Sequence, residues 1–280
     1  MRFAITGTDR YVGVFNALIE AGWQPVKFFT VPVDNRIYFN RNMIECADRN
    51  GVPVQMSRLR QDDLAELAER GCQVLVVASY NWRIPDWRPF LPYAVNFHPS
   101  PLPIGRGPMP LVRAILDGHR TWGMSCHKLE HEFDAGDILA QEMFPLQEGD
   151  GFDVLDLRLQ AAAKKLAGRV GGSFHELWQD ATPQGEGSYW QKWTDADRTL
   201  DYGQPVARIL RLARAFGPFE VLARVKGAQI HVRRLTGWEE AHGRPAGELV
   251  YTSGNTLVIT SPDGYIALLE WSLLGPDDRV

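Results

Sequence analysis

The chain has 280 residues, 45% of them hydrophobic, which is enough to bury a substantial core in one large domain or two modest ones. Its 30 basic and 34 acidic residues give a formal net charge of -4, so a nucleic-acid partner would need a local basic patch. The N-terminus lacks an apolar signal core, and no apolar run approaches the roughly 18 residues of a membrane span, so we expect a cytoplasmic protein with no membrane partner.

Strand-like and helix-like segments alternate through the first hundred residues. The expected strands are residues 2–6, 25–31, 52–56, 74–78 and 94–97, and the expected helices are residues 12–21, 42–50 and 62–70. The run 74–78 is apolar throughout, which is typical of a parallel strand covered by helices on both faces. This order predicts an α/β fold with a doubly wound, mostly parallel, Rossmann-like sheet.

The second half changes in character. We expect strands at 124–129 and 137–145, and then a long helix at 154–178 that Gly171 and Gly172 can bend or interrupt. After a helix at 205–215, the expected strands are residues 220–225, 229–234, 247–251, 256–260 and 265–271. We therefore predict a catalytic domain at 1–185, a linker at 181–187, and a small β-rich, OB-like domain at 200–280.

Several common kinds of site are disfavoured by missing motifs. No GxGxxG follows the first strand and no Walker lysine is present, which argues against nicotinamide and ATP chemistry. The three cysteines are widely spaced without a CxxC pair, so neither a disulfide framework nor a zinc site is indicated. His127 and His131 have no partner at metal-ligand spacing, and we expect no metal.

The densest chemical signal is the segment 96–103, with the sequence NFHPSPLP, followed by Arg106. The period of a strand places Asn96 and His98 on one side, and the prolines stiffen the loop after them. An amide N–H and an imidazole can stabilise a developing oxyanion, and Asp134 can orient His98 or hold a water that accepts a proton. Each residue also has a purely structural interpretation, and Asp134 beside Gly136 can simply form a turn.

Two spaced motifs carry a family resemblance. They are Asn96-x-His98-x-Ser100 with Leu102-Pro103 and Arg106-Gly107-x-x-Pro110, and Asp134-x-Gly136-Asp137-Ile138-Leu139. Together they resemble the signature of the 10-formyltetrahydrofolate-dependent formyltransferases, and residues 211–218 with the strands after them resemble the C-terminal domain of the methionyl-tRNA enzymes. Pro101 stands where many relatives have leucine, so the acceptor side of the loop is expected to differ in shape.

The resemblance implies that 10-formyltetrahydrofolate is the formyl donor, with Asn96, His98 and Asp134 as the catalytic residues. The residues that it implies for donor binding are Tyr80, Arg83, Ile84 and Asp137, although Tyr80 can equally be an ordinary aromatic at the rim. For the acceptor we name Ser100, Arg106, Asp9 and Asn35, the last two also being typical of turns.

The acceptor is expected to be the amine of a small molecule. Residues 205–280 hold nine Arg and Lys against eight Asp and Glu, too even a balance for an extensive phosphate footprint, so transfer RNA is disfavoured. The segment 85–103 resembles siderophore N5-hydroxyornithine formyltransferases, which favours that acceptor. An amino-sugar nucleotide, methionyl-tRNA, hydrolysis by water and a non-catalytic folate sensor remain alternatives, and a homodimer is left open.

Overall fold

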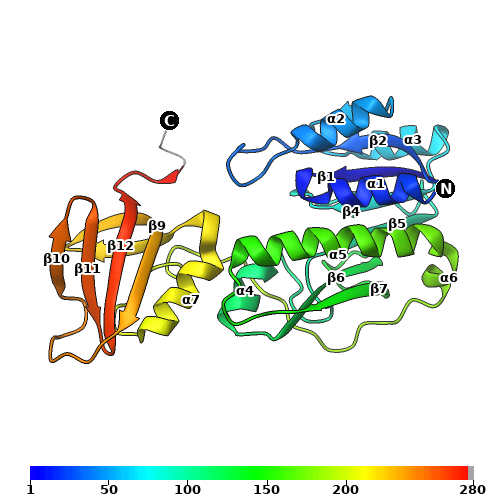
Figure 1. Ribbon diagram of the computed structural model, residues 1–280. Coiled ribbons are helices and arrows are strands. Elements are labelled where there is room, and N and C mark those ends of the chain that lie inside the picture. Colours follow the sequence, from blue (N-terminus) through cyan, green and yellow to red (C-terminus); the bar gives the residue numbers. More distant parts are fainter. Residues whose placement is uncertain (277–280) are drawn as a thin grey trace. The chain divides into compact units, whose positions relative to one another are not determined.

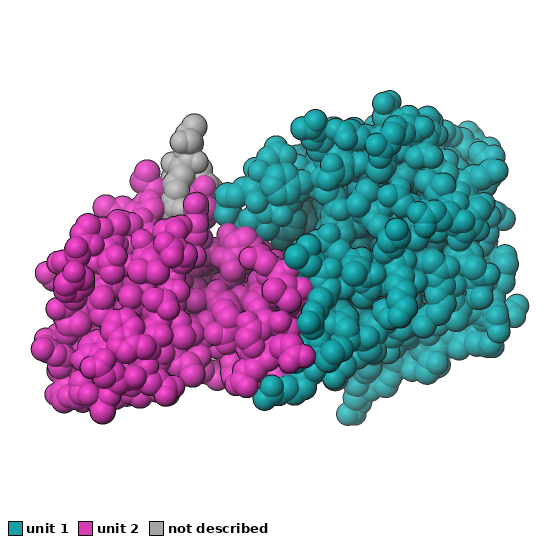
Figure 2. All heavy atoms as spheres, in the orientation of Figure 1, with its two compact units in different colours: residues 1–110, 120–146, 156–190 teal, residues 111–119, 147–155, 191–280 magenta. Residues whose placement is uncertain are grey.

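The computed structural model describes residues 1–276, whose helices and strands are shown in Figure 1. The chain divides into two compact units, coloured separately in Figure 2. Unit 1 contains residues 1–110, 120–146 and 156–190, and unit 2 contains residues 111–119, 147–155 and the chain from 191 onward. The last four residues of the domain expected at 200–280, residues 277–280, lie outside the described part.

A seven-stranded sheet forms the centre of unit 1. Its strands are β1 (Arg2–Gly7), β2 (Gln24–Phe29), β3 (Val54–Gln55), β4 (Val74–Ala78), β5 (Tyr93–His98), β6 (Thr121–Lys128) and β7 (Ile138–Pro145). They are ordered β3-β2-β1-β4-β5-β6-β7. All pairs from β3 to β5 are parallel, whereas β6 pairs antiparallel with both β5 and β7. The mostly parallel α/β sheet is thereby confirmed.

The helices of the first 190 residues alternate with these strands along the chain or follow them (Figure 1). They are α1 (Val12–Glu20), α2 (Arg41–Arg49), α3 (Gln61–Glu69), α4 (Pro110–Leu116), α5 (Phe152–Gly172) and α6 (Phe174–Gln179). The single helix expected at 154–178 is two helices, because Ser173, with φ -132°, leaves the helical conformation directly after the glycine pair. Helix α4 was not anticipated from the sequence, since it is only seven residues long.

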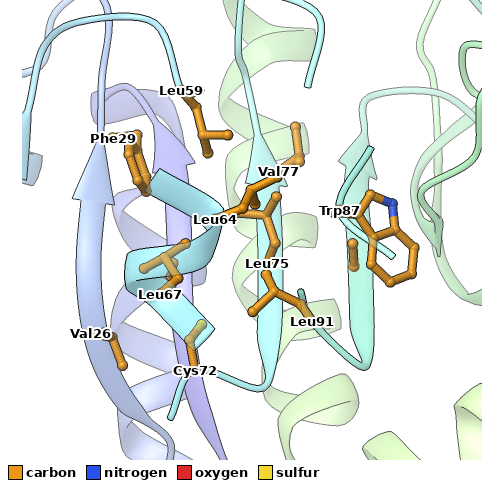
Figure 3. Close-up of a cluster of buried hydrophobic side chains, with 12 residues drawn as sticks. Val26, Phe29, Leu59, Leu64, Leu67, Cys72, Leu75, Val77, Trp87 and Leu91 are labelled. Carbon is orange, nitrogen blue, oxygen red and sulfur yellow. The ribbon is translucent and has the colours of Figure 1, made fainter. Parts of the chain in front are cut away.

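Apolar side chains cover both faces of the sheet. Leu75 and Val77 of β4 alternate along the strand and pack against Leu64 and Leu67 of α3, as Figure 3 shows. Where α5 packs beside the end of α1, Gly171 permits close packing, because a Cβ at this position would lie only 2.7 Å from the Cβ of Ala21. The central strands are thus buried from both sides, and their carboxyl ends open onto loops.

Unit 2 contains helix α7 (Val206–Phe216) and a five-stranded antiparallel sheet. Its strands are β8 (Val221–Val225), β9 (Ala228–Glu239), β10 (Leu249–Ser253), β11 (Thr256–Ser261) and β12 (Gly264–Ser272), ordered β10-β11-β12-β9-β8. Strand β9 is longer than the expected 229–234 because it pairs with both β8 and β12. The small β-rich part of the chain is confirmed. Within residues 1–276 no helix has the length and apolarity to cross a membrane.

Candidate active site

Three polar side chains meet at the carboxyl end of β5. Asn96 and His98 lie on one side of this strand, whereas Phe97 between them is buried in the core. Asn96 Nδ2 donates to Asp134 Oδ1 at 3.2 Å, and His98 Nδ1 lies 3.3 Å from the same oxygen. The structure therefore brings Asn96, His98 and Asp134 together around a single carboxylate oxygen.

Asp134 reaches this position from the turn between β6 and β7. Its φ is 57°, in the left-handed region that aspartate tolerates better than most residues. The backbone N–H of Gly107 donates to Asp134 Oδ2 at 2.9 Å, so both carboxylate oxygens have partners. The sequence left open whether Asp134 forms a turn or faces His98, and in the structure it does both.

The surroundings fix the charge of Asp134. Burial raises the pKa of this carboxyl, but His98, His127 and the N–H of Gly107 lower it more, to about 2. Asp134 is thus an anion throughout the neutral range and a weak base. For His98, burial lowers the pKa below its ordinary value, although the Asp134 charge and the Gly105 carbonyl act in the opposite direction.

The hydrogen bonds of His98 define where its protons lie. Nε2 is 2.9 Å from the carbonyl oxygen of Gly105, and because a carbonyl only accepts, Nε2 carries a hydrogen. Nδ1 then faces the Asp134 carboxylate, which would hold a second proton at that atom. His98 can therefore become a transient imidazolium whose two N–H groups both have acceptors.

The loop after β5 is held by side chains from the two antiparallel strands. Ser125 Oγ donates to the carbonyl of Ser100 at 2.6 Å and accepts the N–H of Leu102 at 3.1 Å. Gln141 donates to the Leu102 carbonyl at 2.8 Å. Ser100 itself, expected to bind the acceptor, is fully buried, and its hydroxyl has no hydrogen-bond partner within residues 1–276. In this conformation Ser100 supports the loop and does not face solvent.

The segment 181–187, expected to be a linker, belongs to unit 1 and crosses the site. Thr182 pairs with Ile138 through two backbone hydrogen bonds of 2.8 and 2.9 Å. Gln184 Nε2 donates to the carbonyls of Asp134 (2.8 Å) and Gly136 (2.7 Å), while its Oε1 accepts from Arg106 Nε at 3.0 Å. The polar composition of the segment 181–187 is typical of linkers. However, its backbone and Gln184 form hydrogen bonds within unit 1, so the prediction of a linker between domains is wrong.

A hollow of about 410 Å³ lies beside the Asp134 turn. Its lining residues are Arg83, Arg106, His131, Glu132, Phe133, Ala135 and Tyr189. The Arg83 guanidinium lies 5.5 Å from the centre of the Phe133 ring and donates to the His131 carbonyl at 3.0 Å. Phe133 and Tyr189 are exposed aromatic side chains, so the hollow combines ring faces with two guanidinium groups. Arg83 and Arg106, expected on the donor and acceptor sides, line one and the same hollow.

The other residues expected to bind the donor have structural partners. Tyr80 and Ile84 are partly buried against the apolar cluster under α3, and the Tyr80 hydroxyl accepts the N–H of Leu59 at 2.8 Å. Asp137 forms an ion pair with Lys128 at 3.0 Å. Tyr80 therefore has the partly buried position of a rim aromatic, and its contact with a donor stays a prediction.

Asp9 and Asn35, named for the acceptor, occupy a helix cap and a turn. The Asp9 carboxylate accepts the N–H groups of Asn42 (3.1 Å) and Met43 (2.8 Å) at the start of α2. Asn35 has φ 53°, and its N–H donates to the carbonyl of Tyr38 at 3.1 Å. These contacts account for both residues without an acceptor.

Two residues of the site were missed by the sequence reasoning. His127 is buried on β6, and its Nε2 lies 3.1 Å from Asn96 Nδ2. It lies within an expected strand, but the partner strand and register could not be read from the sequence. Gln184 carried no signal, because it lies in a polar segment that pairs with distant residues. No group of three or more His, Cys, Asp or Glu side chains in residues 1–276 could hold a metal ion.

Comparisons with known proteins show what this chain resembles. A family model described as "Formyl transferase" matches residues 38–170. The methionyl-tRNA formyltransferase of Pseudomonas entomophila is 27% identical over 98% of this chain and 92% of its own length. The N-formyltransferase of Helicobacter canadensis, solved with folinic acid and dTDP-3-aminofucose, has a TM-score of 0.69 at 16% identity, covering 96% of this chain and 99% of that one.

A second solved structure shares the fold as part of a longer protein. HypX from Aquifex aeolicus, in complex with tetrahydrofolic acid, has a TM-score of 0.66 at 20% identity over 96% of this chain. The chain spans only 43% of the length of HypX. At these identities, both solved structures establish the fold alone.

Proposed function

We propose that this chain is a formyltransferase in which Asn96, His98 and Asp134 transfer a formyl group from 10-formyltetrahydrofolate to an amine, as the matched family model and the similar methionyl-tRNA formyltransferases support. One observation carries this proposal: at the end of β5, the Asn96 amide and the His98 imidazole both lie within 3.3 Å of the same carboxylate oxygen of Asp134. The folates bound to the HypX and Helicobacter canadensis enzymes support the choice of donor.

The reaction begins when the acceptor amine attacks the formyl carbon carried by N10 of the folate. A C–N bond forms, and the formyl oxygen becomes an oxyanion, which Asn96 stabilises by donating an N–H group and His98 stabilises by its positive charge as an imidazolium. The tetrahedral intermediate then collapses, the bond between the formyl carbon and N10 breaks, and tetrahydrofolate leaves. One proton passes in total from the amine to N10.

Asp134 acts in this scheme mainly through its charge. A carboxyl with a pKa of about 2 is a poor proton acceptor, but it remains negative throughout the reaction. It lies 3.3 Å from Nδ1 of His98, where it stabilises the imidazolium form while the oxyanion is present. It can also orient the water that first receives the proton of the amine.

The hollow beside Asp134 supports a flat, anionic ligand. Phe133 and Tyr189 offer ring faces, and Arg83 and Arg106 offer guanidinium groups that bind carboxylates or phosphates. A folate has both features, with its aromatic rings and its glutamate carboxylates. Arg106 also contacts Gln184, which holds the backbone of Asp134, so ligand contacts at Arg106 bear on the geometry of the catalytic residues.

For the acceptor we propose a small amine, with N5-hydroxyornithine as the first compound to test. Its carboxylate suits a guanidinium partner such as Arg106. Transfer RNA remains disfavoured, because basic residues of unit 2 lie beside carboxylates: Arg233 with Glu220, Arg234 with Glu270 and Arg244 with Glu248. Such pairs leave less positive charge for a phosphate backbone.

An amino-sugar nucleotide is the second candidate, because the Helicobacter canadensis structure contains one and the two arginines of the hollow can also bind a diphosphate. Methionyl-tRNA is the third, on account of the relatives that match 98% of the chain. Each of these acceptors uses the same donor and the same catalytic residues.

The experiment that tests the proposal follows tetrahydrofolate release from 10-formyltetrahydrofolate. Purified protein is supplied separately with N5-hydroxyornithine, amino-sugar nucleotides, methionyl-tRNA and buffer, with Asn96→Ala as the control of reduced activity. Turnover with N5-hydroxyornithine supports the full proposal, and turnover with another amine retains the chemistry and replaces the acceptor. Release with buffer alone identifies a hydrolase, whereas folate binding without any turnover refutes the enzyme assignment.

A further inference from the structure

His127 contacts Asn96 from the neighbouring strand. In the antiparallel pair of β5 and β6, Asn96 lies directly opposite His127, so the two side chains project from the same face of the sheet. His127 is 1% exposed, and its Nε2 lies 3.1 Å from Asn96 Nδ2. A histidine buried this deeply needs hydrogen-bond partners at both ring nitrogens.

The partners of His127 determine which ring nitrogen carries the hydrogen. Nδ1 lies 2.8 Å from the carbonyl oxygen of Lys128, which can only accept, so Nδ1 carries the hydrogen. In the neutral ring Nε2 is then an acceptor, and it receives one N–H of Asn96 at 3.1 Å. Asp134 Oδ1 also faces this nitrogen, but at 3.7 Å it is beyond hydrogen-bond distance. Strand β6 therefore presents a fixed acceptor to the amide of Asn96.

The orientation of the Asn96 amide follows from its two neighbours. Its nitrogen lies 3.1 Å from His127 Nε2 and 3.2 Å from Asp134 Oδ1, both of which accept hydrogen bonds. The reversed amide would place its oxygen against a carboxylate oxygen and a ring lone pair, which is electrostatically unfavourable. Asp134 and His127 together therefore keep the N–H groups of Asn96 directed toward the centre of the site.

We propose that His127 is a positioning residue that aligns the amide of Asn96 for donation to the formyl oxygen. This inference rests on the proposed formyl transfer. Both N–H groups of Asn96 are engaged when no substrate is bound, so the formyl oxygen must take over one of them as the reaction proceeds. His127 limits the rotation of the Asn96 amide plane, so the amide already has the orientation in which it can donate an N–H to the formyl oxygen.

A matched pair of substitutions separates the acceptor atom from the bulk of the ring. His127→Gln places a side-chain oxygen within reach of the position of Nε2, whereas His127→Leu fills similar space without an acceptor. We expect His127→Leu to lower kcat by about 10- to 100-fold with the donor KM changed less than about 3-fold, as for a misaligned catalytic group. His127→Gln should keep at least about a third of the wild-type kcat on the same grounds.

A double-mutant cycle with Asn96→Ala provides the decisive comparison. If His127 acts through Asn96, His127→Leu has no further effect on kcat in the Asn96→Ala background, because the group that it positions is gone. Multiplicative losses, or equal kcat values for His127→Leu and His127→Gln, would overturn the inference. Wild-type protein is assayed alongside the variants. If the wild type shows no turnover, the proposed function is wrong. If the wild type is active and His127→Leu is equally active, only the positioning role of His127 is wrong.

Discussion

Asp134→Asn tests the charge at the centre of the site while nearly preserving the size of the side chain. The substitution removes the anion that lies 3.3 Å from His98 Nδ1 and 3.2 Å from Asn96 Nδ2. It also leaves one of the Asp134 partners without an acceptor, because an amide has only one oxygen. We expect kcat to fall by at least about 100-fold, the usual cost of losing an electrostatic or proton-transfer group.

The same substitution has a cost in stability that can be worked out from the pKa. The pKa of the Asp134 carboxyl falls from its ordinary value of 3.8 to about 2 in the folded protein. This shift corresponds to about 2 kcal/mol of folding stability at neutral pH. The side chain is only 12% exposed, so solvent screening reduces this little. Since the pKa is lowered in the folded state, the stabilisation is complete above pH 3.8 and is lost as the pH falls through about 2.

Urea unfolding followed by tryptophan fluorescence measures this difference. The difference in unfolding free energy between wild type and Asp134→Asn should be constant from about pH 7 to 8, where His98 is neutral, and should narrow below about pH 4 as Asp134 is protonated. Asp137→Asn is the matched stability control, because its ion pair with Lys128 is 38% exposed at the carboxylate and should contribute under about 1 kcal/mol. Unfolding of Asp134→Asn at the wild-type free energy at pH 7 would refute the charge argument.

Three further substitutions have defined outcomes. His98→Ala should lower kcat in the tetrahydrofolate-release assay by at least about 100-fold without altering the circular dichroism spectrum, and near-normal turnover would remove His98 from the mechanism. Gly107→Ala should lower the unfolding free energy by at least about 1 kcal/mol in urea, because φ is +108° and the added Cβ would overlap the Trp190 carbonyl oxygen; unchanged stability would contradict this. Gly168→Ala, in an exposed turn of α5 with no atom within 4 Å of the added Cβ, should raise the unfolding free energy by about 0.5–1 kcal/mol with unchanged turnover; a loss of stability would show that the helix is constrained there.

Local patterns predicted the elements that bury their own side chains. The run 74–78 is strand β4, buried along its whole length, because a short run of apolar, β-branched residues is typical of a strand covered on both faces. Asn96 and His98 share one side of β5 because alternation is a property of the strand itself. Even the break after Gly171 and Gly172 was open to prediction, since two glycines weaken a helix wherever it packs.

The pairing between distant segments could not be predicted from such local patterns. His127 takes its role from the register in which β6 lies antiparallel to β5, and a shift by one residue would place Cys126 opposite Asn96 instead. The segment 181–187 reads as a linker because it is polar and contains proline and glycine, yet its backbone and Gln184 bind the turn that holds Asp134. Such contacts join residues about 50 positions apart, and no local periodicity reports them.

The sequence by itself determined the class of fold, the strand that carries Asn96 and His98, and the kind of chemistry that these residues and Asp134 can perform, because residue type and alternation are local properties. Only the tertiary structure decided that Asp134 accepts from Asn96 and Gly107 beside His98, that His127 completes the network, and that Arg83 and Arg106 line one hollow. These depend on strand order and register, which are set when the whole apolar core is buried together.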